Sequence, residues 1–187
     1  IYISPTANPQ KAVEIAVNAK MRRVGICGAA ETILIHKDVV NTIGRDITTA
    51  LIKAGCEVRG AAEISALHPD VKLANETDWG CEFLAPIIAI KSVENMGEAT
   101  SHIQQFGSGH TESILSEDKT EQEAFFASVD SAIVMANAST QFADGGEFGM
   151  GAEIGIATGR LHARGPVGAN QLTSFKYIVR GHGQTRP

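Results

Sequence analysis

The 187-residue sequence has few cysteines and no long apolar stretch. Its three cysteines, at positions 27, 56 and 81, form no Cys-x-x-Cys pair, so we expect neither a disulfide framework nor a metal site. The longest uncharged stretches, 83–90 and 131–142, are too short or too polar to cross a bilayer. Residues 1–3 also lack the basic flank of a signal peptide. We therefore expect a cytoplasmic protein with no membrane partner.

The sequence also has no long run of like charges. The sequence has 16 Lys and Arg residues against 21 Asp and Glu residues, a formal net charge of −5, and neither sign forms a long run. Without a basic stripe to neutralise phosphates, nucleic acid is not expected as a partner. The length suits one globular domain or slightly more.

What the sequence does contain is an alternation of helical and strand-like apolar spacing, which is typical of α/β proteins. The predicted helices are residues 9–20, 38–53, 94–105 and 121–128. The predicted strands are residues 32–36, 57–60, 85–91, 112–115, 131–136 and 173–180. This order predicts an open, mostly parallel twisted sheet with helices on both faces.

A glycine-rich region follows the strand predicted at 131–136, with eight glycines between residues 138 and 170. A segment that follows a parallel strand lies at the carboxyl edge of the sheet, where open α/β sheets bind ligands. The region contains neither a dinucleotide fingerprint nor a phosphate-binding loop. It could therefore be a substrate-contacting loop or a set of ordinary turns. We divide the chain into a domain over 1–170 and a carboxyl-terminal strand and tail over 171–187.

Cys27 is the candidate nucleophile, because its small neighbours would let a substrate approach the sulfur closely. The alternative is an inert buried thiol, which is the common state of free cysteine. Cys56 and Cys81 fit that alternative better. His110, in a tight polar loop, could be an acid or base or a hydrogen bonder that orients a neighbour.

Six segments together resemble the gamma-glutamyl phosphate reductase family, also called glutamate-5-semialdehyde dehydrogenase, of the aldehyde dehydrogenase superfamily. They are GICGAAET (25–32), FGSGHTE (106–112), NAST (137–140), FADGGEFGMGAEIG (142–155), HARGP (162–166) and YIVRG (177–181). The resemblance extends over essentially the whole chain, with the segments in the same order. It implies an aldehyde dehydrogenase-like catalytic domain.

The resemblance also implies roles for individual residues. Cys27 matches the family nucleophile, although Gly28 stands where many members have Asn. Glu82 matches the superfamily glutamate that holds the nicotinamide ribose. In this sequence Leu84 and Ala85 replace the aromatic residue and the glycine that follow it. A solvated charge at the end of a strand is the alternative for Glu82.

Ser139 and Thr140 match a string that lines the substrate pocket, where hydroxyls could bind a carboxylate or the leaving phosphate. Gln141 stands where this pattern often has Arg, so a cation for the substrate must come from elsewhere. Arg164 is one candidate, and a structural salt bridge is its alternative. Phe148 could form an apolar wall near the thiol or pack in the core.

The function implied is NADPH-dependent reduction of L-glutamyl 5-phosphate to L-glutamate 5-semialdehyde in proline biosynthesis, through a cysteine thioester. The family further implies a homo-oligomer, with 171–187 as an intersubunit arm. It also implies a chain about twice as long, so we expect an amino-terminal cofactor-binding domain to be missing here and the fragment alone to be inactive.

Two other function classes remain open at this point. One is a cysteine-dependent acyl transferase or amidohydrolase that uses Cys27 with His110 and needs no nicotinamide. The other is a non-catalytic α/β module that has kept the fold.

Overall fold

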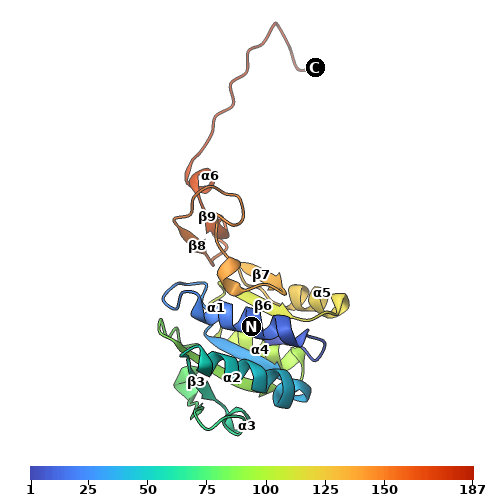
Figure 1. Cartoon of the computed structure of the whole chain (residues 1–187). Helices are drawn as coiled ribbons and strands as arrows, with labels where there is room; N and C mark the ends of the chain where they lie inside the picture. The colour runs from blue at the N-terminus through green and yellow to red at the C-terminus, as the bar shows by residue number, and fades with distance from the viewer.

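The computed structural model describes residues 1–187 and is built on a seven-stranded sheet (Figure 1). The strands are β1 (Tyr2–Ile3), β2 (Thr32–His36), β3 (Glu57–Gly60), β4 (Lys72–Leu73), β5 (Ile87–Val93), β6 (Thr111–Leu115) and β7 (Ile133–Ala136). They lie in the order β4-β3-β5-β2-β1-β6-β7, and every neighbouring pair is parallel. The predicted open parallel sheet is confirmed.

Strand β1 occupies an inner position that the sequence did not predict. Tyr2 is in register with Leu34 of β2 on one side and with Ile114 of β6 on the other. Two residues are too few for a periodic pattern, which explains why the strand was missed. β1 joins the four strands on one side of it to β6 and β7 on the other.

Six α-helices accompany the sheet. They are α1 (Pro9–Met21), α2 (Arg45–Lys53), α3 (Ala62–Ser65), α4 (Met96–Phe106), α5 (Lys119–Ser128) and α6 (Ala169–Leu172). Asn8, Asn95 and Asp118 cap α1, α4 and α5 by accepting backbone N–H groups through their side chains. None of the helices combines the length and the apolar character that crossing a membrane requires.

Side-chain alternation along the inner strands produces an apolar layer on each face of the sheet. Ile3 and Ile35 belong to a cluster of 21 buried residues that includes the inner faces of α1 and α2. Their neighbours Tyr2 and Leu34 point to the other face, into a cluster that contains Phe125 of α5. Both faces of these strands are therefore covered, which accounts for their continuous apolar sequence.

Two predicted elements are corrected by the structure. Residues 173–180 form no strand: they extend, exposed, away from the body (Figure 1), because no neighbouring strand in this chain supplies hydrogen-bond partners. The helix predicted from Asp38 begins instead as a 3-10 turn (Lys37–Val39) and a π turn (Val40–Gly44) before α2. This segment is rich in β-branched residues and ends in glycine, both of which weaken α-helix formation.

The glycine-rich region contains a second, small sheet. Strands β8 (Gly155–Ala157) and β9 (Gly165–Val167) pair antiparallel next to α6. Figure 1 shows this hairpin beyond β7, between the main sheet and the extended tail.

Candidate active site

A cavity of about 490 Å³ lies at the amino edge of the main sheet. Its walls are the segment before β2 (27–32), the turn before β5 (80–82), the end of α4 with the following loop (102–108), the start of β6 (110–112), Thr140 and Thr158. Nearly all these segments precede or begin strands. The cavity that contains Cys27 and Thr140 therefore lies at the edge opposite to the carboxyl edge expected for the glycine-rich region.

Thr140 lies at the amino edge of the main sheet because the chain reverses directly after β7. Asn137 adopts a positive φ of 51°, and its side chain accepts from the N–H of Ser116 (3.0 Å) and donates to the Ser116 carbonyl (2.8 Å). The following residues run back along β6, and Ser113 Oγ donates to the carbonyl of Ala138 (2.8 Å). The reversal brings Thr140 to the opposite edge, beside Gly28.

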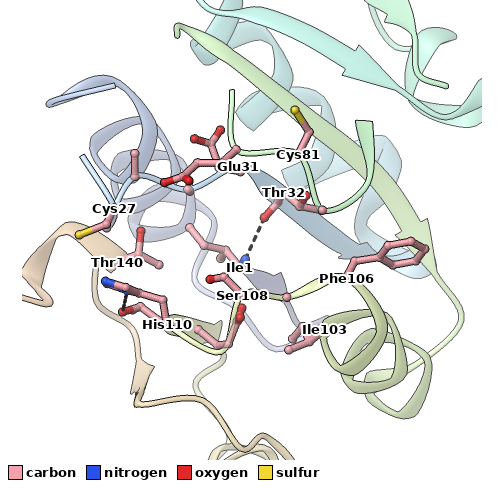
Figure 2. Close-up of a pocket in the computed structure, with 18 of the residues that line it drawn as sticks. Ile1, Cys27, Glu31, Thr32, Cys81, Ile103, Phe106, Ser108, His110 and Thr140 are labelled. Carbon is pink, nitrogen blue, oxygen red and sulfur yellow. Dashed lines mark hydrogen bonds between the residues drawn. The ribbon is translucent and has the colours of Figure 1, made fainter. Parts of the chain in front are cut away.

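Cys27 lies in the loop between α1 and β2 and is exposed at the cavity (Figure 2). The loop is tied by two backbone hydrogen bonds, from Ala29 to Ile26 and from Ala30 to Ala19, both 2.9 Å. Cys81 also lines the cavity and is half-buried, whereas Cys56 is buried in the core. Burial raises the pKa of the Cys56 thiol to about 11, so Cys56 fits its predicted inert role.

Gln141 fixes the loop that carries Cys27. Its side-chain amide, which is buried, donates to the carbonyls of Ala19 (2.8 Å) and Arg23 (3.2 Å). A Cβ at Gly28 would stand 3.1 Å from the carbonyl oxygen of Thr140, so the two segments are in close contact. Ser139 caps the short turn Thr140–Phe142 by accepting from the N–H of Gln141 (3.3 Å) and does not line the cavity.

Unsatisfied polar atoms are concentrated at this cavity. Six buried side-chain polar atoms in the structure have no hydrogen-bond partner, and four of them belong to lining residues. These four are Glu31 Oε1, His102 Nε2, His110 Nε2 and Thr140 Oγ1. Buried polar groups are normally paired, so this concentration indicates a site shaped for a polar ligand.

Glu82 is exposed at the cavity wall, and the residues that follow it lie close to Glu31. Glu31 pairs with Lys20, whose side chain is fully buried, and the backbone of Phe83 and Leu84 favours the charged carboxylate. Burial nevertheless raises the pKa of Glu31 above its ordinary value, because desolvation outweighs these contacts. Leu84 has a positive φ of 52°, a strained conformation for this residue.

Comparisons with known proteins were made for the whole chain. No family model matches it. The chain is 58% identical over 187 residues to a gamma-glutamyl phosphate reductase of Caulobacter sp. (strain K31) and 56% identical to that of Rhizobium etli. The chain is homologous to part of a gamma-glutamyl phosphate reductase. The match covers 100% of this chain but only 45% and 44% of the length of these two relatives.

Solved structures agree with this relationship. The crystal structure of gamma-glutamyl phosphate reductase from Thermotoga maritima matches with a TM-score of 0.91 and 46% identity, covering 100% of this chain and 45% of that one. An acetylating aldehyde dehydrogenase from Geobacillus thermoglucosidasius matches with a TM-score of 0.67 at 20% identity, covering 98% and 51%. The resemblance and the aldehyde dehydrogenase-like fold are both confirmed.

Neither Arg164 nor Phe148 lines the cavity in this chain. Arg164 donates to the Asp130 carboxylate (2.7 Å), to the Asp130 carbonyl (2.6 Å) and to the carbonyl of Thr158 (3.2 Å). This arrangement favours the salt-bridge alternative over substrate binding. Phe148 is partly exposed, with its ring centroid 6.3 Å from that of Phe142, and it packs in no core cluster.

The sequence reasoning missed Glu31 and His102 as site residues, and it named Gln141 only as a departure from the family pattern. Glu31 and His102 carry unpartnered atoms at the cavity, and Gln141 holds the Cys27 loop. Glu31 and His102 stand inside or beside the family-like segments, which was a usable signal. No local pattern marks Gln141 as a link between segments more than a hundred residues apart.

Proposed function

We propose that this chain is the thiol-bearing part of an enzyme that reduces L-glutamyl 5-phosphate to L-glutamate 5-semialdehyde with NADPH in the cytoplasm. The supporting observation is the exposed thiol of Cys27 in a polar cavity, within a chain homologous to gamma-glutamyl phosphate reductases. Residues 1–170 form the catalytic domain in this proposal. Residues 171–187, which expose Phe175, Tyr177 and Val179, form an arm that packs on another subunit.

The reaction begins at Cys27. Its thiolate attacks the acyl carbon, phosphate leaves, and a thioester remains on Sγ. The backbone N–H groups of Cys27 and Gly28 donate no hydrogen bond within the chain and can stabilise the tetrahedral oxyanion. Thr140 contributes a buried hydroxyl with no partner, which can bind an oxygen of the substrate.

NADPH fits the cavity in part. The exposed carboxylate of Glu82 can accept hydrogen bonds from ribose hydroxyls. The other carboxylates on the wall are Glu31 and Glu112, and no Lys or Arg lines the cavity. The cavity wall itself therefore offers no Lys or Arg side chain to the cofactor phosphates. When bound, NADPH supplies the hydride that reduces the thioester, while the cavity walls exclude water.

The test is the reverse reaction of the complete protein, followed as NADPH formed from L-glutamate 5-semialdehyde, phosphate and NADP⁺. Cys27→Ser should lower the rate by more than about 1,000-fold, because the thioester cannot form without the thiol and the other residues of the site depend on it. Cys81→Ser, at the same cavity, is the matched control and should retain most activity. Near-normal activity of Cys27→Ser would refute the proposal.

A separate measurement concerns the chain on its own. We expect residues 1–187 in isolation to show no NADPH-dependent reduction, since the relatives are more than twice as long. Measurable turnover by the isolated chain would contradict this part of the proposal.

One observation favours a second candidate function. His110 Nε2 is unpaired in the same cavity as Cys27, as a cysteine-dependent acyl transferase would require. Trp79 lies against His102 of the cavity wall, with ring centroids 5.7 Å apart, so its fluorescence reports on occupancy. Quenching by NADPH supports the reductase, and its absence together with acyl transfer to an amine or water supports the alternative.

A further inference from the structure

The imidazole of His110 is held rigidly at the cavity with one nitrogen free. Nδ1 lies 2.7 Å from Thr111 Oγ1, whereas Nε2 is buried without a partner. The backbone is fixed by β7, since the N–H of Ile133 donates to the His110 carbonyl (3.0 Å) and that of Ala132 to the Gly109 carbonyl (2.8 Å). The free nitrogen is therefore oriented by the fold.

Figure 2 shows His110 and Cys27 on the same side of the cavity, with Thr140 between them in the view. Thr140 is 4% exposed, and its hydroxyl is also unpartnered. Nε2 has no partner in the chain, so Sγ of Cys27 is not yet within hydrogen-bond reach of it. Proton transfer between the two groups during acylation then requires one bridging water or their closer approach when substrate binds.

We propose that His110 is a catalytic residue whose Nε2 takes the thiol proton as Cys27 attacks the acyl carbon. This inference rests on the proposed function. Nδ1–H then donates to Thr111 Oγ1, which leaves the lone pair of Nε2 directed into the cavity. Thr111 is the positioning residue that holds the ring through Nδ1, and the proposed role requires the tautomer in which its hydroxyl accepts.

The electrostatic surroundings suit this role. Burial lowers the pKa of His110, so the imidazole is neutral near pH 7 and its lone pair is available. The carboxylates of Glu153 and Glu82 oppose this shift, and they would stabilise the imidazolium that forms during the attack. Glu31 and Glu112 are the other acidic groups on the cavity wall.

The step balances in atoms and charge. The proton moves from Sγ to Nε2 while the sulfur electron pair forms the S–C bond. The C–O bond to phosphate then breaks with its electron pair, and Nε2–H gives its proton to the departing oxygen. His110 is neutral again when the thioester has formed. After hydride transfer the C–S bond breaks, and the thiolate of Cys27 is protonated from solvent.

The experiment measures acylation without cofactor or natural substrate, using the complete protein and p-nitrophenyl acetate. The rate of the p-nitrophenolate burst reports attack by Cys27. His110→Gln should lower the burst rate about 100-fold at pH 7, the typical contribution of a positioned base. The deficit should shrink below about 10-fold at pH 9, where most of an ordinary thiol is already ionised. His162→Gln, an exposed histidine outside the cavity, is the matched control.

A second readout is chemical rescue. Added imidazole should restore much of the burst rate of His110→Ala, because the small base can occupy the vacated space. A deficit equal at all pH values, with no rescue, would show that His110 is only structural and would overturn the inference.

These outcomes separate the two proposals. A pH-dependent, rescuable burst in a protein that never oxidises L-glutamate 5-semialdehyde with NADP⁺ would retain the proton transfer and reject the reductase. The reverse pattern would retain the reductase and reject the role of His110.

Discussion

The link between Gln141 and the Cys27 loop leads to a prediction about Gln141→Met. Methionine keeps nearly the same shape but removes the amide that donates to the carbonyls of Ala19 and Arg23. The Ala19 carbonyl keeps a second donor, the N–H of Ala30 at 2.9 Å. The substitution therefore leaves the Arg23 carbonyl without its partner, and the Arg22 guanidinium loses a long contact (3.5 Å) to Gln141 Oε1.

The magnitude follows from these contacts. A buried neutral hydrogen bond contributes about 1 kcal/mol net, so two lost bonds should lower the free energy of unfolding by about 2 kcal/mol. Gln122 provides a matched control, since its buried amide makes one comparable bond, to the Ser116 carbonyl at 2.7 Å, far from the thiol. Gln122→Met should cost about 1 kcal/mol.

Urea unfolding measures both losses, and hydrogen exchange shows where they act. Gln141→Met should speed exchange of the Ala30 amide, which is bonded within the Cys27 loop, while Gln122→Met should leave it unchanged. A loss of stability below about 0.5 kcal/mol would refute the assigned contacts. Equal exchange in both variants would refute the local role of Gln141.

Three further predictions concern buried ionisable groups. Lys20→Met leaves Glu31 buried without its partner and should cost about 3–5 kcal/mol in urea unfolding, whereas adding Glu31→Leu should recover much of that loss. Cys56, with its pKa raised to about 11 by burial, should resist iodoacetamide at pH 8 while Cys27 is alkylated, as peptide mass spectrometry would show. Burial lowers the pKa of His102 to about 4, so the folded state binds fewer protons than the unfolded one between pH 6.5 and 4. Stability should therefore fall by roughly 3 kcal/mol as the pH drops through this window, and His102→Phe should remove the decline.

The sheet was predictable because its strands carry their own signal. Strands buried on both faces are continuous runs of Ile, Leu and Val, and helix ends are marked by Pro9 and by Gly55, whose φ is +86°. Such features depend on a few neighbouring residues. The same locality explains why the family-like segment around Cys27 could be identified and why the structure places it at a cavity.

What escaped prediction depends on contacts between distant residues. The edge at which the site lies is decided by Asn137, whose turn is stabilised by Ser116 of another segment. Residues 173–180 have the apolar composition of a strand but pair with no other strand of this chain, which their own sequence could not show. The unpaired nitrogen of His110 becomes visible only when every neighbouring atom is in place.

The inner position of β1 has a consequence for the order of events during synthesis. Tyr2 is made before its partner Ile114 in β6, which follows 112 positions later. The middle of the sheet therefore keeps an open edge until β6 has been made, and β2 is the neighbour that β1 can acquire early. Closure of such a long loop is slow and leaves apolar surface exposed meanwhile. Translation pauses placed before residue 111 should therefore prolong the aggregation-prone stage, whereas pauses after residue 136 should not.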